Sequence, residues 1–388
     1  MHVTTGLLLL ALLIARDAAG VTIGERPTAA RPSAVSTLRL VTFNIHAWRD
    51  SDHKDNLERI CAQLLSLDAD IVCLNEVLHK FTAPPPDDPY WQEVRQRRGH
   101  GYPPPASSVP VDEADSYLMR LSKALSLPNV AYGPACSDGF FGGFPFGNAV
   151  LSKYALADVH HLLLRLQPGD LTLGGQERTK EDLEPRSVTL VRVKLPPSQA
   201  LPCGASVGVC CTHLDHKSEE LRERQIREAA AEAHRAFGGL DGCPTVLCGD
   251  LNSFGRQDMS EEAWATACEY FRSRGWPQPP ERSLVCNALD DIGFADSYRE
   301  WQARPSRFSP EEEALTPADE SPPPLTCWSH RPLYRLDYVC LRQHPRAAVA
   351  NVALDPPAPA RLEVRSHQTI ASDVSDHHAV CVDFDVVQ

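Results

Sequence analysis

Short runs of apolar residues recur along the chain and predict a protein rich in β-strands. Some runs alternate apolar with polar positions, as in LRLVTFN at 38–44, and others are continuous, as in IVCLN at 71–75. Alternation is typical of a strand with one buried face, and a short continuous run is typical of a strand buried on both faces. The predicted strands are 38–44, 71–75, 148–152, 187–194, 206–212, 244–248, 334–341 and 380–386.

Other segments predict helices, because their apolar residues recur at three- and four-residue spacing. In 54–67, one stripe contains Leu57, Ile60, Cys61, Leu64 and Leu65. The clearest helix begins at Ser218, a residue type that can cap it, and runs to 237. Further helices are expected near 114–126 and 260–273, and the Gly-, Phe- and Pro-rich segment 133–147 predicts an irregular loop. Strands without strict βαβ alternation predict an α/β fold with two packed sheets and helices outside.

The amino terminus predicts a segment outside this fold. The ten-residue apolar run GLLLLALLIA at 6–15 is too short for a membrane-spanning helix, which needs about 20 residues. It fits a signal peptide over 1–20 with cleavage before Val21, or else an uncleaved anchor. Residues 21–36 are predicted to be a linker, and 37–388 the folded domain, with a Pro-rich insertion near 303–325. We therefore expect a secreted protein or one in the secretory pathway.

Composition narrows the possible functions. The chain has 388 residues and a net charge of −13, which argues against a polybasic nucleic-acid-coating protein. Thirteen cysteines are present, an odd number, and no C-x-x-C pair supports a zinc site. Cysteines within strand-like runs are expected to be buried core thiols, namely Cys73, Cys210, Cys211, Cys248, Cys340 and Cys381. One or two disulfides remain open among Cys136, Cys203, Cys243, Cys268, Cys286 and Cys327.

Polar residues follow the apolar strands and are predicted to form a site. We expect them at the carboxyl ends of the strands, where side chains are held rigidly but remain accessible. Carboxylate and amide oxygens without cysteine favour Mg²⁺ or Mn²⁺ over zinc. A hard cation together with histidines suits attack by water on a phosphate ester. The residues concerned are Asn44, Glu76, His213, Asp215, Asp250, Asn252, Asp337, Asp376 and His377.

A series of motifs resembles the endonuclease/exonuclease/phosphatase superfamily. The motifs occur in family order over 38–387: VTFNIHAW (41–48), IVCLNEV (71–77), FGNAVLSK (146–153), RSVTLVRVKL (186–195), CCTHLDH (210–216), VLCGDLNS (246–253), RLDYVCL (335–341) and SDHHAV (375–380). The resemblance implies a deoxyribonuclease I-like four-layer sandwich of two mostly antiparallel sheets flanked by helices. It also implies a divalent-metal-dependent phosphoesterase or phosphodiesterase.

The resemblance also implies roles for individual residues. Glu76 is expected to be the main metal ligand, with Asn44 and Asp376 beside it. Asp250 is expected to align or deprotonate the attacking water, and Asn252 to donate to the phosphate. His377 is expected to be the catalytic histidine, oriented by Asp337. Further expectations are a catalytic role for His213 and phosphate binding by Asn148 and Arg186.

Simpler interpretations exist for several polar residues. Asn44 could cap a turn, and Glu76 could be a solvated acid at a strand end. Asp215 and His216 are better explained as residues that cap the helix beginning near Ser218. We interpret His378 as a neighbour of the site, and His160 and His161 as surface residues. The basic run of Arg95, Arg97 and Arg98 is more typical of a solvated face than of a phosphate site.

The sequence leaves the substrate open among nucleic acid, inositol or sugar phosphate, and a phospholipid head group. Phosphatase, nuclease and sphingomyelinase-like lipid phosphodiesterase activities all use such a site. The alternative from another class is a catalytically inactive family member that acts as a binding protein. No obligate protein partner is evident from the sequence.

Overall fold

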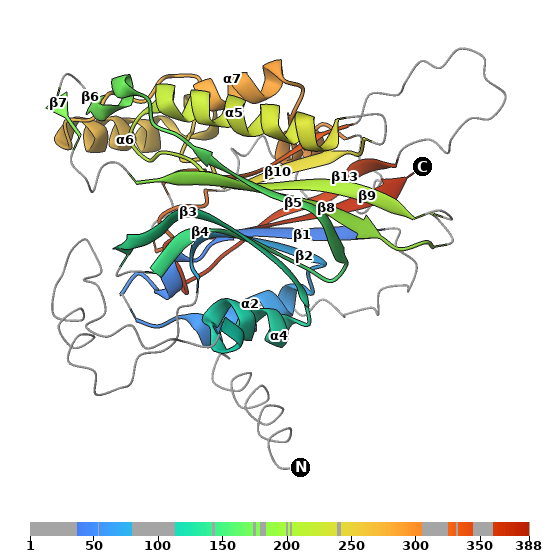
Figure 1. Ribbon diagram of the computed structural model, residues 1–388. Helices are drawn as coiled ribbons and strands as arrows, with labels where there is room; N and C mark the ends of the chain where they lie inside the picture. The colour runs from blue at the N-terminus through green and yellow to red at the C-terminus, as the bar shows by residue number, and fades with distance from the viewer. Residues whose placement is uncertain are drawn as a thin grey trace, which may run out of the picture. The chain divides into compact units, whose positions relative to one another are not determined.

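The computed structural model describes most of the chain from residue 37 to residue 387 (Figure 1). The predicted signal peptide, the linker, the basic run at 95–98 and nearly all of the Pro-rich insertion lie outside the described residues. Within the described residues, no helix is long and apolar enough to cross a membrane. The gaps in the description are 53, 80–112, 142–143, 174–175, 179–183, 199–200, 202–203, 239–241, 305–324, 331–332 and 344–359.

The first of two six-stranded sheets contains the amino-terminal and carboxy-terminal strands side by side. β1 pairs in parallel with β2, and the other pairings in this sheet are antiparallel. The strand order is β13 (Arg361–Ile370), β14 (Ala379–Val387), β1 (Thr37–Asn44), β2 (Ile71–Leu78), β4 (Phe144–Ser152) and β3 (Asn129–Phe141).

The second sheet has the same mixture of pairings, with β9 and β10 parallel and its other pairings antiparallel. Its order is β11 (Ala295–Asp296), β12 (Asp337–Arg342), β10 (Thr245–Asp250), β9 (Ala205–His213), β8 (Arg186–Leu195) and β5 (Ala155–Leu164). A small separate pair joins β6 (Thr172–Leu173) to β7 (Gln176–Glu177). The two mostly antiparallel sheets confirm the predicted fold class.

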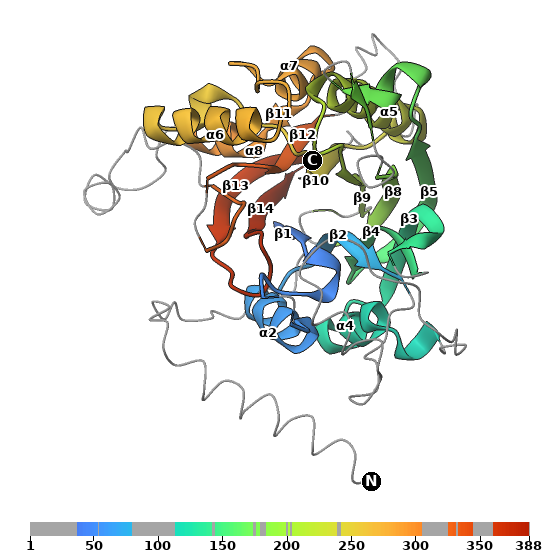
Figure 2. The ribbon, with the colours of Figure 1, turned by 90° about the vertical axis from the view of Figure 1, so that its left-hand side faces the viewer.

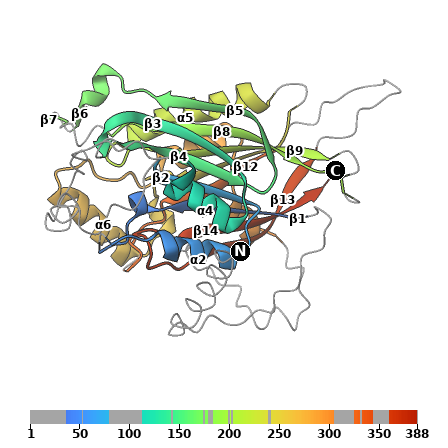
Figure 3. The same ribbon diagram turned by 60° about the horizontal axis from the view of Figure 1, so that its bottom comes forward.

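Helices cover the outer faces of both sheets (Figure 2). Figure 3 shows α2 (Leu57–Leu67) and α4 (Tyr117–Leu125) over the first sheet. α5 (Glu219–Phe237) and α7 (Leu284–Asp291) cover the second sheet. Ser218 caps the amino terminus of α5, and its side chain accepts from Leu221 N, as predicted. The remaining helices are α6 (Glu261–Ser273), α8 (Ser297–Gln302) and the short 3₁₀ turns η1 (His46–Trp48), η2 (Glu113–Asp115), η3 (Pro168–Leu171) and η5 (Arg256–Asp258).

Alternation along the strands divides the core into layers. In β2, Val72 and Leu74 pack toward α2 and α4, whereas Ile71 and Cys73 face the second sheet. Side chains of one strand point alternately to its two faces, so each strand contributes to two apolar layers. The result is a helix–sheet–sheet–helix sandwich with one apolar cluster at each of its three interfaces.

The cysteine prediction is confirmed for the strand residues. Cys73, Cys210, Cys211, Cys248 and Cys340 are at most 2% exposed and have free thiols, and Cys381 is buried. Among the residues for which a disulfide was left open, Cys243, Cys268, Cys286 and Cys327 also have free thiols, while Cys203 lies outside the described residues. The strand cysteines therefore serve as small apolar core residues.

The prediction of an irregular loop at 133–147 is wrong, because β3 and β4 form a hairpin across this segment. Gly147 pairs with Pro134, and a Cβ atom on Gly147 would lie only 2.1 Å from the carbonyl oxygen of Gly133. A Cβ on Gly133 would lie 2.2 Å from Thr189 Oγ1 in β8. These glycines permit close approach of neighbouring strands and do not mark a loop.

The helix prediction at 54–67 also needs one correction. Leu57, Ile60, Cys61 and Leu64 are buried as predicted, but Leu65 is 49% exposed. Leu65 lies in the last turn of α2, where the chain leaves the sheet through Asp68 in a left-handed conformation. Helical spacing alone does not show which residues in the last turn of a helix still pack against the sheet.

Candidate active site

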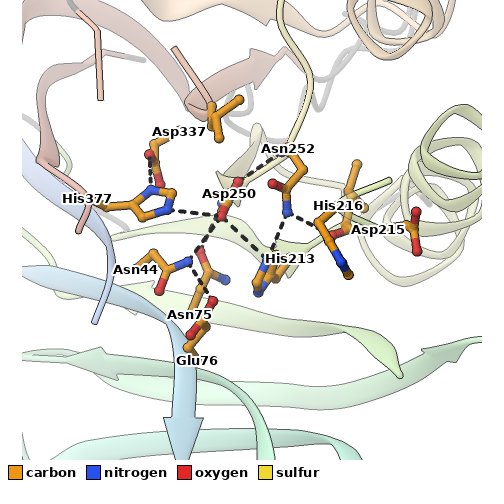
Figure 4. A network of polar contacts seen from close by, with 12 residues as sticks. Asn44, Asn75, Glu76, His213, Asp215, His216, Asp250, Asn252, Asp337 and His377 are labelled. Carbon is orange, nitrogen blue, oxygen red and sulfur yellow. Dashed lines mark hydrogen bonds and ion pairs between the residues drawn. The ribbon is translucent and has the colours of Figure 1, made fainter. Parts of the chain in front are cut away.

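Polar side chains from both sheets meet at one edge of the sandwich (Figure 4). β1, β2, β9 and β10 bring their carboxyl ends to this edge, as predicted. Asp337 and His377 reach it differently: Asp337 is the first residue of β12, and His377 precedes β14. Both strands run antiparallel to their neighbours β10 and β1, so their beginnings lie where those neighbours end. The expectation that all site residues follow their strands is therefore wrong for these two and for Asp376, which also precedes β14.

The carboxylate of Asp250 is at the centre of the site. Asn44 Nδ2 donates to Asp250 Oδ2 at 3.1 Å, and the same oxygen lies 3.4 Å from His213 Nε2 and 3.6 Å from His377 Nε2. Burial raises the pKa of Asp250 to about 7, with a further increase from Asp337 and an opposing effect of His377. Asp250 can therefore exchange a proton near neutral pH.

His377 is held between two carboxylates. Its Nδ1 lies 2.8 Å from Asp337 Oδ2, and both side chains are buried. Burial by itself would lower the pKa of His377, but the interactions with Cys327, Asp337 and Asp250 outweigh it and raise that pKa well above its ordinary value. The geometry therefore favours a charged imidazolium.

Glu76 enters the site from an irregular position in β2. The register of β2 against β4 shifts between Leu74 and Val77, and Glu76 has a φ of 59°. Positive φ is uncommon for a non-glycine residue, and such irregularities can redirect a side chain. Here the irregularity brings Glu76 Oε1 to 3.1 Å from Asn44 Nδ2.

The acidic side chains around Glu76 suit a hard cation. Burial raises the pKa of Glu76, and the carboxylates of Asp376 and Glu184 add to the rise, while His46 and Asn44 oppose it. Within the described part of the chain, no three His, Cys, Asp or Glu residues are grouped to hold a metal. Mg²⁺ usually binds through only one or two carboxylates, water and substrate phosphate, so Glu76 and Asp376 fit such a site.

Asn44 is oriented differently from a metal ligand. Its amide nitrogen donates to both Glu76 and Asp250, and its Oδ1 accepts from His46 N at 3.1 Å. In this orientation Asn44 links the two carboxylates. A metal role for Asn44 stays a prediction.

His213 lies on the opposite side of Asp250, among cationic and amide groups. Arg186 Nη1 lies 3.1 Å from His213 Nδ1, and Asn252 Nδ2 lies 3.0 Å from His213 Nε2. Arg186 and the amide nitrogen of Asn252 are both donors, so they compete for the single acceptor nitrogen of a neutral imidazole. Burial, with Arg186, His377 and His216 adding to it, lowers the pKa of His213 well below its usual range, so this ring is neutral.

Arg186 and Asn148, the two predicted phosphate-binding residues, are both buried. Arg186 Nη2 donates to Glu184 Oε2 at 2.7 Å, so its charge is partly neutralised, but it remains next to His213. Asn148 instead lies between the sheets, where its Nδ2 donates to Ser187 O at 2.9 Å. Arg186 thus lies at the site. Asn148 instead links β4 of the first sheet to β8 of the second.

Asn75 is a site residue that the sequence analysis missed. Its Nδ2 donates to Asn148 Oδ1 and to Thr212 O, and its Oδ1 accepts from Asp250 N at 2.9 Å. A fully buried amide thus ties β2 to β9 and β10 and fixes the backbone of Asp250. The available signal was a polar residue inside the apolar run IVCLNEVL.

Asp215 follows its simpler interpretation. Asp215 Oδ1 accepts from Lys217 N and Ser218 N, which turns the chain into α5. Asp215 also forms a buried ion pair with Arg178, whose Nη2 lies 2.7 Å from Asp215 Oδ2. Arg178 is in none of the sequence motifs, so nothing in the sequence pointed to this contact.

Two other histidine expectations can be compared with the structure. His160 and His161 are exposed, as expected. His378 is buried beside the site, where Nδ1 accepts from Ser372 N at 3.0 Å, so it is a neighbour of the site as expected.

Two mixed sheets with flanking helices and a polar centre at one edge define the deoxyribonuclease I-like class of α/β sandwich. The profile of the endonuclease/exonuclease/phosphatase family matches residues 41–377, and the chain belongs to this family. Enzymes of the family are generally phosphoesterases that typically use a divalent metal.

A solved structure of the family agrees with this fold. An endonuclease/exonuclease/phosphatase from Beutenbergia cavernae is 19% identical, with a TM-score of 0.51, over 91% of this chain and 72% of that protein. A second, from Bacteroides vulgatus, is 15% identical, with a TM-score of 0.48, over 90% of this chain and 99% of that protein. No curated protein sequence matches the chain significantly.

Proposed function

We propose that the protein is a divalent-metal-dependent hydrolase of phosphate esters. The observation that carries the proposal is the position of the Asp250 carboxylate between a neutral and a charged histidine, with the charged one paired to Asp337. A base that can accept a proton beside a cationic donor is what attack by water on phosphorus requires.

Each side chain of the site has a separate role in the proposed reaction. Asp250 orients the attacking water and accepts its proton. His377, kept charged by Asp337, stabilises the negative charge that develops on the phosphoryl oxygens, and Asn252 donates to them. Glu76 and Asp376 would hold Mg²⁺ or Mn²⁺, which when bound offsets charge on the phosphate.

The proposal can be tested with two chromogenic esters. The protein should hydrolyse p-nitrophenyl phosphate or bis(p-nitrophenyl) phosphate with added Mg²⁺ or Mn²⁺, and EDTA should stop the reaction. Asp250→Asn should lower kcat by at least about 10²-fold, whereas Asp291→Asn, at a side chain that is 65% exposed, should leave it unchanged. Absence of hydrolysis of both esters with either metal would instead support the alternative of an inactive binding protein.

We also propose that the amino-terminal segment directs the protein to the secretory pathway. The support is the ten-residue apolar run followed by small residues before Val21. Expression in a cell with a secretory pathway, followed by amino-terminal sequencing of the protein from the medium, should give a chain that begins at Val21. Retention of the full-length chain in the cytosol would exclude export.

A further inference from the structure

The chain passes through a left-handed turn shortly after Asn44, at the edge of the sandwich where the site lies. The three residues of η1, His46, Ala47 and Trp48, have φ angles of 51°, 52° and 64°. This conformation is uncommon and costly for residues that carry a Cβ atom, and it persists only where the surrounding structure enforces it. Three such residues in succession therefore need strong contacts around them.

Buried contacts hold the turn at both of its ends. Trp48 is 1% exposed, its Nε1 donates to Leu78 O at 3.2 Å, and its ring packs edge-on against Tyr117 with centroids 5.6 Å apart. At the other end, the backbone N of His46 donates to Asn44 Oδ1 at 3.1 Å. The position from which the His46 side chain projects is therefore fixed.

The other non-glycine residues with positive φ, among those that the structure describes, fall into two groups. Asp68 and Ser126 end α2 and α4, where a left-handed residue is common, and Asp158 lies at a shift of register in β5, the last strand of its sheet. Glu76 and Asn252 belong to the site. The turn at His46 adjoins the site and ends no α-helix, so it belongs with the second group.

The imidazole of His46 lies beside the two carboxylates that are proposed to hold the metal. Its Nδ1 is 3.8 Å from Asp376 Oδ1, and about a quarter of the side chain is exposed, with a value of 27%. Burial raises the pKa of Glu76, and His46 opposes this rise more strongly than Asn44 does. His46 therefore interacts with both carboxylates.

Asp376 needs a donor to fix its direction. Ser375 Oγ lies 3.4 Å from Asp376 Oδ1, but a hydroxyl has only one proton, and this one is directed to Asn44 O at 2.7 Å. Within the described part of the chain, His46 is then the side chain placed to donate to Asp376. A carboxylate that binds a metal is usually oriented by such a partner, and loss of the partner typically lowers metal affinity by about 10–100-fold.

We propose that His46 is a positioning residue for the divalent cation: it orients the Asp376 carboxylate toward the metal that Asp376 and Glu76 would hold. The left-handed turn at 46–48 places the imidazole for this role. This inference rests on the metal site of the proposed function and adds a residue to it. His46 acts through Asp376 and is not itself a metal ligand.

The test uses substitutions that keep the backbone of the turn. Glycine and asparagine both tolerate positive φ, so His46→Gly removes the imidazole without adding strain. His46→Asn restores a nitrogen at the same number of bonds from Cα as Nδ1. Ser126→Gly is the matched control, because Ser126 also has a positive φ, of 55°, and is exposed at the end of α4.

Isothermal titration with Mn²⁺ gives the dissociation constant of each variant, and thermal unfolding in EDTA gives its stability without metal. His46→Gly should raise the Kd for Mn²⁺ by at least about tenfold. Its Tm in EDTA should not fall, because glycine adopts this conformation without strain. His46→Asn should recover most of the lost affinity, and Ser126→Gly should bind Mn²⁺ as the wild type does.

The outcomes separate this inference from the proposed function. An unchanged Kd in His46→Gly, or equal losses in His46→Gly and His46→Asn, would overturn the role of His46 and leave the metal site standing. A purely structural role predicts a lower Tm in EDTA with an unchanged Kd. Absence of Mn²⁺ binding by the wild type, or binding that Glu76→Gln leaves unchanged, would overturn the proposed metal site and the role of His46 with it.

Discussion

His377 and Asp337 are 40 residues apart in the chain, yet the histidine Nδ1 lies 2.8 Å from the aspartate Oδ2. Asp337 is fully buried, and its backbone N donates to Thr326 Oγ1 at 3.1 Å. The histidine is anchored from the other side, where its own N donates to Ser375 Oγ. Each of the two residues is thus held in place by its own backbone hydrogen bond, and these bonds pre-organise the pair.

The first prediction is that this pair acts as one unit. His377→Ala and Asp337→Asn should each lower kcat by about 10²-fold or more, because each leaves the transition-state charge without its oriented cation. The double variant should be little worse than the worse single variant, since the second change removes a partner that has already lost its function. Steady-state kinetics on p-nitrophenyl phosphate or bis(p-nitrophenyl) phosphate measure the three losses.

Thermal unfolding of the same variants provides the control. If the buried carboxylate of Asp337 served only to stabilise the fold, Asp337→Asn would lower Tm and leave kcat nearly intact. Losses that simply multiply in the double variant would show that the residues act independently.

The second prediction concerns Glu76. Glu76→Gln keeps the size of the side chain but removes the charge that would hold a divalent cation, so Mn²⁺ binding should weaken by at least tenfold and activity should fall by orders of magnitude. Folding should persist, because the raised pKa of Glu76, due mainly to burial, indicates that its charge opposes the fold. Isothermal titration with Mn²⁺ gives the binding constant without an activity assay.

Glu261→Gln is the matched control for this substitution, because the side chain of Glu261 is 82% exposed. It should bind Mn²⁺ as the wild type does. Unchanged Mn²⁺ affinity in Glu76→Gln, or full activity of the wild type in EDTA, would refute the metal assignment.

The third prediction concerns the core cysteines. Cys73, Cys211 and Cys248 lie together in the apolar layer between the sheets. Burial raises the pKa of Cys73 and Cys211 well above the usual range, whereas hydrogen bonds from these two thiols lower the pKa of Cys248 to about 5. A buried, protonated thiol reacts slowly. The native protein should therefore react with few equivalents of a thiol reagent, and the denatured protein, without reductant, with several more. Only one reactive thiol after denaturation would mean that these cysteines are paired.

The fourth prediction concerns His367, on β13 and away from the proposed site. Burial, together with the positive charge of Arg335, lowers the pKa of His367 to about 3, and both ring nitrogens lack a hydrogen-bond partner among the described residues. Below pH 6.5 the unfolded chain therefore binds a proton that the folded protein does not bind. The stability should fall as the pH falls from 6.5 toward 3, by up to about 1.4 kcal/mol per pH unit from this residue.

His367→Phe should remove this contribution, because phenylalanine keeps the ring against Tyr298 and has no titrating group. The advantage of the variant in the free energy of unfolding should grow between pH 7 and pH 4.5, measured by urea denaturation. His160→Phe, at an exposed position, should show no such growing advantage. An advantage of His367→Phe that is independent of pH would contradict the assigned cause.

Most of the strands and most residues of the site could be predicted from the amino-acid sequence. Each strand can be predicted from its own segment, because the alternation of apolar and polar residues, as in LRLVTFN, reflects which face of the strand is buried. The motifs similarly placed Glu76, Asp250 and His377, and all three lie at the same edge of the sandwich. The cysteine positions also followed from local pattern, since each lies within an apolar run.

The way in which those segments meet could not be predicted, because it depends on tertiary contacts. The Gly-rich stretch at 133–147 forms part of a hairpin, in which the glycines allow a closer approach of neighbouring strands than a Cβ atom would permit. Asn75 accepts a hydrogen bond from the backbone of Asp250, which lies 175 positions later in the chain. Arg178 pairs with Asp215, which lies 37 positions later. Such contacts depend on strand order and register, which are set by the packing of the whole core and leave no periodic trace in the sequence around each residue.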